Sequence, residues 1–218
     1  MSGQRHLTTL VDESRPILIK MLEKRGFDVS KLKTFSPNTR IDNLDSMSIK
    51  TCGVKDNNQI VQVHYEIVSS RTNHKKLTKI IEDIVNKLNE TDRKKDLTLI
   101  FIVRDCMTPS VKEAVRNLQN KYNIFIQIFP IRSLTYDVTK HSVVPEHIRI
   151  PINNFEDFGV SDFLDSLHIP SLEKLPIILD NDPQAMFIGL RPGELCKIVR
   201  PSLSAGVHIA YRYCLSAK

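Results

Sequence analysis

The chain has 218 residues, of which 41% are hydrophobic and 26% charged, the balance of a globular protein with a sizeable core. No apolar run approaches the ~20 residues of a membrane span, and the first residues lack the apolar stretch of a secretory signal. The net charge of +6 is uneven, because residues 1–140 carry +8 and residues 141–218 carry −2. This split is typical of a nucleic-acid-facing half joined to a protein-facing half, although an ordinary basic surface gives the same numbers.

Metal and cofactor sites are not indicated. The four cysteines lie far apart without a CxxC pair, and no two histidines fall at i, i+4 on one predicted helix. The motifs of a nucleophile elbow and of a phosphate-binding P-loop are also absent. We therefore expect no metal and no cofactor, and we expect buried free thiols at Cys52, Cys106, Cys196 and Cys214.

The first quarter of the chain predicts one helical region followed by irregular structure. Apolar residues recur at helical spacing from Leu7 to Leu22, and Pro16 within them predicts a kink or a division into two helices. Gly26 predicts the end of this region. Residues 27–58 are polar and rich in Ser, Asn and Asp, so we expect short helices and loops there.

The next segments alternate between strand and helix. Gln59–Val68 alternates apolar and polar residues, while Asp96–Arg104 and Asn123–Phe129 are the continuous apolar runs of strands covered on both faces. His74–Leu88 and Thr108–Tyr122 have helical spacing. Strand, helix and strand in close succession predict parallel strands and an α/β sheet.

A small α+β domain is predicted beyond a junction at His141–Ile150. Its expected elements are a helix or two within Phe155–Leu167, a short helix that begins at Asp182-Pro183 and ends at Gly189, and a hairpin of the strands Leu195–Val199 and Val207–Tyr213.

A basic α/β domain has two candidate activities. A metal-dependent nuclease places an acid and a lysine two residues apart on a central strand, but Glu66-Ile67-Val68 lacks that lysine. The alternative is nucleic-acid contact at the start of the Thr108–Tyr122 helix, where exposed N–H groups attract phosphate. The residues that flank this start are Arg104, Thr108, Pro109, Ser110 and Lys112. Thr108 can cap the helix and Pro109 suits its first turn, so a good helix start without any ligand is the simpler interpretation.

The last third of the chain resembles a known family. "HSVVPEHIRI" and "LPIILDNDPQAMFIGLRPGELCKIVRPSLSAGVHIAYRY" follow the pattern H-x-x-V-P-x-H, L-P-x-I-x-x-x-D-P, G-x-x-x-G-x-x-x-K-I-x-R-x-S-x-x-x-G and Y-R. These motifs resemble those of the fifth of the subunits shared by the eukaryotic nuclear RNA polymerases, a family whose archaeal RNA polymerase members consist of this part alone. Thr108-Pro109-Ser110 resembles a motif of the N-terminal domain in that family, and the divergence of residues 1–95 would suit a protist or a large DNA virus.

The resemblance implies an architecture and a role. We expect an α/β N-terminal jaw domain with a restriction-endonuclease-like sheet over residues 1–140, and a small α+β C-terminal assembly domain over residues 141–218. The protein would be a non-catalytic subunit of a multi-subunit DNA-directed RNA polymerase, in the nucleus of a cell, or at the virion or cytoplasmic replication site of a virus. Its jaw would lie beside downstream double-stranded DNA, which raises the expectation of DNA contact at Thr108-Pro109.

The expected partners are the largest polymerase subunit and neighbouring small subunits, with no membrane and no small-molecule substrate. The residues that the resemblance implies for docking are His147, Asp182, Pro183, Gly189, Arg191, Gly193, Lys197, Arg200, Tyr211 and Arg212. Internal ion pairs are the alternative for the three arginines. Two other functions remain open: the nuclease, and an assembly module that never touches DNA.

Overall fold

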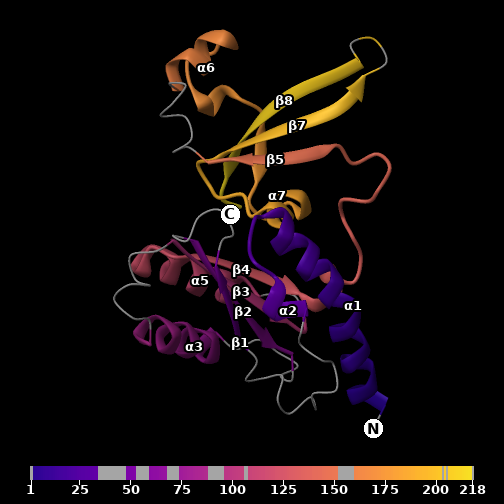
Figure 1. The fold of residues 1–218 in the computed structure, drawn as a ribbon. Helices are drawn as coiled ribbons and strands as arrows, with labels where there is room; N and C mark the ends of the chain where they lie inside the picture. Colours follow the sequence, from indigo (N-terminus) through magenta and orange to yellow (C-terminus); the bar gives the residue numbers. More distant parts are fainter. Residues whose placement is uncertain are drawn as a thin grey trace. The chain divides into compact units, whose positions relative to one another are not determined.

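The computed structural model describes residues 2–33, 48–52, 59–67, 74–87, 96–105, 108–151, 160–202, 204 and 206–217. The chain separates into two compact units, Met1–Tyr136 and Asp137–Lys218 (Figure 1). The division into a jaw domain over residues 1–140 and an assembly domain over residues 141–218 stays a prediction, because compactness does not show independent folding. No helix in the described ranges is long and apolar enough to cross a membrane.

The N-terminal unit is built on a four-stranded sheet in the order β1-β2-β3-β4. Its strands are β1 (Ser48–Cys52), β2 (Gln59–Glu66), β3 (Asp96–Val103) and β4 (Phe125–Pro130). The helices α3 (His74–Asn86) and α5 (Pro109–Tyr122) connect β2 to β3 and β3 to β4. The pairs β2–β3 and β3–β4 are parallel, which confirms the predicted crossover arrangement.

Helices cover both faces of this sheet (Figure 1). One face packs against α3 and α5 in a cluster that includes the fully buried Phe101 and Ile81. The other faces α1 (Ser2–Lys24) and the short helix α2 (Ser30–Lys33), which bury Leu7, Val11, Leu18, Met21, Leu22 and Leu32. A strand covered on both faces is mostly apolar, and β3 is apolar without interruption from Leu99 to Val103, with Thr98 as a buried polar exception.

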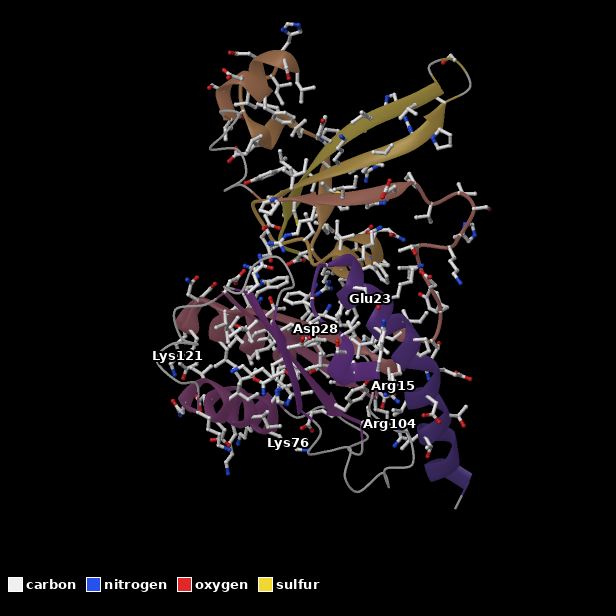
Figure 2. The ribbon with its side chains drawn as sticks, viewed as in Figure 1. Arg15, Glu23, Asp28, Lys76, Arg104 and Lys121 are labelled. Atoms are coloured by element: carbon white, nitrogen blue, oxygen red, sulfur yellow. The ribbon has the colours of Figure 1, made fainter. Side chains whose placement is uncertain are left out.

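The first helix departs from the expected kink or division. α1 continues through Pro16 to Lys24 as one helix, and Gly26 ends the region with a φ of +83° as predicted. Arg15 donates to the carbonyl of Leu32 at 2.5 Å and so ties α1 to α2 (Figure 2). Tertiary packing of α1 against the sheet therefore outweighs the one backbone hydrogen bond that Pro16 removes.

β1 corrects the prediction of only short helices and loops in residues 27–58. It pairs antiparallel with β2, Ile49 opposite Val63 and Thr51 opposite Val61. Three of its five residues are polar, so its sequence carries no clear strand signal. The partner strand, and not the local pattern, decides its conformation.

The C-terminal unit holds a second four-stranded sheet in the order β5-β7-β8-β6. The long hairpin of β7 (Leu195–Ser202) and β8 (Gly206–Leu215) confirms the predicted pair. The sequence pattern did not predict the two other strands of this sheet, β5 (Glu146–Ile150), which lies in the expected junction, and β6 (Ile177–Leu179). β5 pairs antiparallel with β7, and β6 pairs parallel with β8.

One helix packs on each face of this second sheet. α7 (Pro183–Ile188) buries Ala185, Phe187 and Ile188 on one of them. α6 (Val160–Ser166) covers part of the other, where Phe163 meets Tyr211 edge to face with ring centroids 4.9 Å apart. Leu172 of η4 (Leu172–Lys174) belongs to the same cluster, whose buried members are Leu175 and Leu195. The expected helix over Phe155–Leu167 is thus confirmed only from Val160 on, and residues 152–159 lie outside the described ones.

Candidate functional site

One of the C-terminal motifs forms the short capped helix α7. The Asp182 carboxylate accepts from the backbone N–H groups of Gln184 at 2.8 Å and Ala185 at 3.3 Å, and Pro183 occupies the first helical turn. Gly189 ends the helix in the left-handed region at a φ of +69°. Both ends predicted from the sequence are confirmed, because aspartate, proline and glycine each satisfy a local backbone requirement.

A tight turn then leads into the hairpin. Gly193 has a φ of +91°, and Glu194 donates its N–H to the carbonyl of Arg191 at 3.1 Å. Proline at the second and glycine at the third position are the residues that such a turn favours. The backbone direction set here carries β7 across the middle of the sheet.

An ion pair inside the unit fixes this turn to β5. Arg149 donates through Nε and Nη2 to the two oxygens of Glu194, at 2.7 and 2.6 Å. The Glu194 carboxylate also accepts from the N–H of Arg191 at 2.8 Å and is only 8% exposed. Two parallel bonds in a half-buried setting give the pair a fixed geometry. This Arg149–Glu194 pair was missed by sequence reasoning, because residues so far apart along the chain carry no pairing signal.

Several docking residues are held inside the unit. His147 is buried, and its Nδ1 lies 2.9 Å from the carbonyl of Pro145. Gly189 is buried, and the carboxylate of Asp182 serves as the helix cap. These residues shape the unit, and their contact with a partner stays a prediction.

Other docking residues gather on the hairpin. Arg200 and Arg212 are exposed, while Lys197 and Tyr211 are half-buried. Lys197 and Tyr211 lie opposite each other in register. Arg200 Nε donates to Nδ1 of His208 at 3.3 Å. This hydrogen bond joins two side chains of the same hairpin, and it is not the internal ion pair considered as the alternative for this arginine.

The two cysteines of the hairpin are buried and free, as expected. Burial raises the pKa of the Cys196 thiol to about 11 and that of the Cys214 thiol to about 12. Raised pKa values leave these thiols protonated and unreactive near neutral pH. The whole of Cys106 lies outside the described residues, and the Cys52 thiol stays a prediction.

The DNA-proximal candidates gather at one edge of the N-terminal sheet. β2 and β3 end at this edge, and α3 and α5 begin there, since each crossover helix starts beside the carboxyl end of the preceding strand. We call it the carboxyl edge. Its basic residues and helix-start residues are Lys75, Lys76, Lys79, Arg104, Thr108, Pro109, Ser110 and Lys112. Figure 2 labels Lys76 and Arg104 of this group, and Lys121 near the far end of α5.

The α5 start differs from the expected cap in one detail. Thr108 stands at the capping position, but its side chain makes no capping hydrogen bond. Its hydroxyl lies 3.0 Å from the hydroxyl of Ser110 instead, and its carbonyl accepts from Val111 and Lys112. Thr108, Pro109, Ser110 and Lys112 are all exposed, so the first turn of α5 faces solvent.

The edge also holds the acid considered for nuclease chemistry. Glu66 ends β2 and pairs with Lys76 of α3 at 2.8 Å. Within the described residues, no group of three or more His, Cys, Asp or Glu side chains is placed to hold a metal ion. Val68, the residue at the position of the nuclease lysine, lies outside those residues.

Comparison with known proteins finds a matching family for the second unit. Residues 136–214 match the family model of the RNA polymerase Rpb5, C-terminal domain. The C-terminal part of this chain is thus similar to that domain over 79 residues, about a third of the chain. The matched range spans nearly all of the unit that begins at Asp137, including the cap, the turn and the hairpin.

Curated relatives carry the corresponding names. The "DNA-directed RNA polymerases I, II, and III subunit RPABC1" of Caenorhabditis elegans is 32% identical over 113 residues, 52% of this chain and 50% of that protein. The protein with the same description from Dictyostelium discoideum is 33% identical over 116 residues, 53% of this chain and 56% of that protein. The chain thus spans about half the length of the curated relatives that it matches.

Proposed function

We propose that the chain is a non-catalytic subunit of a multi-subunit DNA-directed RNA polymerase. The observation that carries the proposal is the match of residues 136–214 to the Rpb5 C-terminal domain, in agreement with the names of the relatives. The proposed site of action is the nucleus, or the virion or cytoplasmic replication site if a virus encodes the chain.

The C-terminal unit would dock on the largest polymerase subunit and on neighbouring small subunits. Seven of the eight exposed large apolar residues in the described ranges belong to this unit. Exposed apolar residues rimmed by polar ones are typical of protein interfaces. The capped helix, the turn and the Arg149–Glu194 pair would keep this surface rigid before docking.

The N-terminal unit would act as the jaw beside downstream DNA, with the restriction-endonuclease-like sheet that the family resemblance implies. Its carboxyl edge gathers lysines, Arg104 and the exposed first turn of α5, within a unit of net charge +8. Backbone N–H groups and lysines are the groups that bind DNA phosphates without reading sequence. The proposal gives this edge a role in holding the duplex and gives it no chemical step.

Co-purification tests the polymerase assignment. The tagged full-length chain, expressed in the organism that encodes it, is expected to recover the largest polymerase subunit in near-equal amounts. The measurement is quantitative mass spectrometry of the purified complex. Recovery of the chain as a monomer without polymerase subunits would refute the assignment.

A matched pair of charge reversals tests the DNA contact. The double change Lys75→Glu and Lys79→Glu alters the carboxyl edge, whereas Lys87→Glu and Lys121→Glu make the same change near the other ends of α3 and α5. Only the first pair is expected to shorten the lifetime of elongation complexes, and to flatten its dependence on salt, because phosphate contacts release counterions. Equal behaviour of both pairs would favour an assembly module that does not touch DNA.

A further inference from the structure

The β7–β8 hairpin differs in charge from the unit that carries it. Residues 195–215 contain Lys197, Arg200 and Arg212 and no acidic residue, whereas the remainder of residues 137–218 carries −5. The hairpin is therefore a cationic element in an otherwise acidic unit. Such a local reversal attracts an acidic partner, although the whole unit would repel one.

One edge of the hairpin is open. β6 pairs with β8 only from Tyr213 to Leu215, and β5 pairs with β7 on the other side of the hairpin. Among the described strands, none pairs with the outer side of β8 between Gly206 and Arg212 (Figure 1). An edge of this length with exposed apolar side chains is a template for a further strand.

Hydrogen bonds elsewhere in β8 show which backbone groups face that open side. The N–H of Cys214 points to β7 and donates to Glu194, while the N–H of Tyr213 points to β6 and donates to Pro176, both at 2.9 Å. Because the direction alternates along a strand, the N–H and C=O groups of Val207, Ile209 and Tyr211 face the open edge.

The side chains of the hairpin alternate with the same period. Val207 and Ile209, 58% and 47% exposed, share one face with Pro201 and Val199, which lie opposite them on β7. His208 and Arg212 project from the other face, where Arg200 lies opposite His208. A strand that pairs with the open edge thus meets apolar side chains on one face and basic side chains on the other.

We infer that the open edge of β8 accepts an extended segment of another polymerase subunit, in which apolar residues alternate with acidic ones. The apolar residues of the segment cover Val207 and Ile209, and its carboxylates meet Arg212 and Arg200 on the opposite face. Backbone hydrogen bonds to Val207, Ile209 and Tyr211 supply affinity, and the alternation supplies specificity. This inference rests on the proposed function, and it names the partner chemistry that the function leaves open.

A backbone substitution tests the strand pairing. Ile209→Pro removes an N–H that faces outward, so the bonds between β8 and β7 remain, while the matched control Ile209→Ala shortens the same side chain and keeps the N–H. Recovery of the largest polymerase subunit is expected to fall about tenfold for Ile209→Pro and far less for Ile209→Ala. Equal recovery by the proline variant and wild type would overturn the inference.

A charge reversal tests the acidic character of the segment. The double change Arg200→Glu and Arg212→Glu is expected to lower recovery, because it places like charges across the new strand pair. The control Lys140→Glu with Lys174→Glu changes the net charge of the unit equally at exposed positions outside the hairpin, and full recovery is expected. Equal recovery by both double variants would argue against an acidic segment.

Hydrogen exchange of the wild-type chain decides the case even if Ile209→Pro fails to fold. Peptides that cover residues 206–212 are expected to gain protection in the purified polymerase relative to the free chain. No gain would refute the inference, as would a gain that DNA alone produces on the free chain. If wild type recovers no polymerase subunit at all, the proposed function fails, whereas normal recovery without this protection defeats only the strand pairing.

Discussion

The two units differ in how far their sheets are covered by helices. In the N-terminal unit, helices cover both faces, and β3 is buried at every position after its first. In the C-terminal unit, α6 covers only part of one face, and most residues of β8 are exposed or half-buried. The first unit thus buries most of its large apolar side chains, whereas the second exposes seven of them in the described ranges. Four predictions test this contrast.

The largest expected effect lies in the core of the N-terminal unit. Phe101 is fully buried between the sheet and the helices α3 and α5. Phe101→Ala is expected to lower the free energy of unfolding by about 4 kcal/mol through lost burial and a cavity. Hydrogen exchange of peptides from residues 96–103 measures this loss in the free energy of unfolding. The control Ile209→Ala, at an exposed position of the other unit, should cost less than about 0.5 kcal/mol. Similar costs at both positions would remove the contrast.

The next effect is expected in the C-terminal unit. Glu194→Ala leaves Arg149 half-buried without its carboxylate partner and frees the N–H of Arg191. Loss of one member of such a pair is expected to cost about 3 kcal/mol. The readout is hydrogen exchange of peptides from residues 195–215. If that exchange stays at the wild-type rate, the ion pair does not hold the hairpin in place.

An effect of mildly acidic pH is expected in the N-terminal unit. Burial lowers the pKa of His64 to about 4 from the ordinary 6.5, and its ring stacks on Phe101 with centroids 5.2 Å apart. The folded state keeps His64 neutral while the unfolded state binds a proton, so stability falls as the pH drops from 6.5 towards 4. Between about pH 7 and about pH 5 the loss attributable to His64 should be about 2 kcal/mol.

The variant His64→Phe isolates this contribution from other titrating groups. Its free energy of unfolding should fall less than that of wild type over the same pH range. The measurement is a denaturant titration at each pH, followed by hydrogen exchange of peptides from residues 59–66. Parallel pH profiles for the two proteins would mean that the histidine stays solvated in the folded chain.

The smallest effect is expected for an ion pair on the surface of the N-terminal unit. Lys33 and Glu23 lie 2.5 Å apart with both side chains largely exposed. Lys33→Ala should change the free energy of unfolding by less than about 1 kcal/mol, since solvent and salt screen the attraction. A loss as large as that of Glu194→Ala would show that geometry and burial do not separate the two pairs.

Sequence reasoning located the elements that carry their own local signals. The alternation in β2, the apolar run of β3, and the Asp182, Pro183 and Gly189 punctuation around α7 each reflect a requirement that a few neighbouring residues satisfy. The same holds for the hairpin strands. The positions of the docking motifs follow from the sequence because each motif is a run of adjacent residues, while their contact with a partner stays a prediction.

Tertiary structure alone decided the rest, because the deciding partners are distant along the chain. β1, β5 and β6 exist because longer strands beside them offer unpaired backbone groups, and α1 passes Pro16 because the sheet holds it. The Arg149–Glu194 pair and the open edge of β8 also depend on which strands become neighbours. Composition and short-range pattern set which segments are strand or helix, whereas pairing in three dimensions set which surfaces remained for a partner.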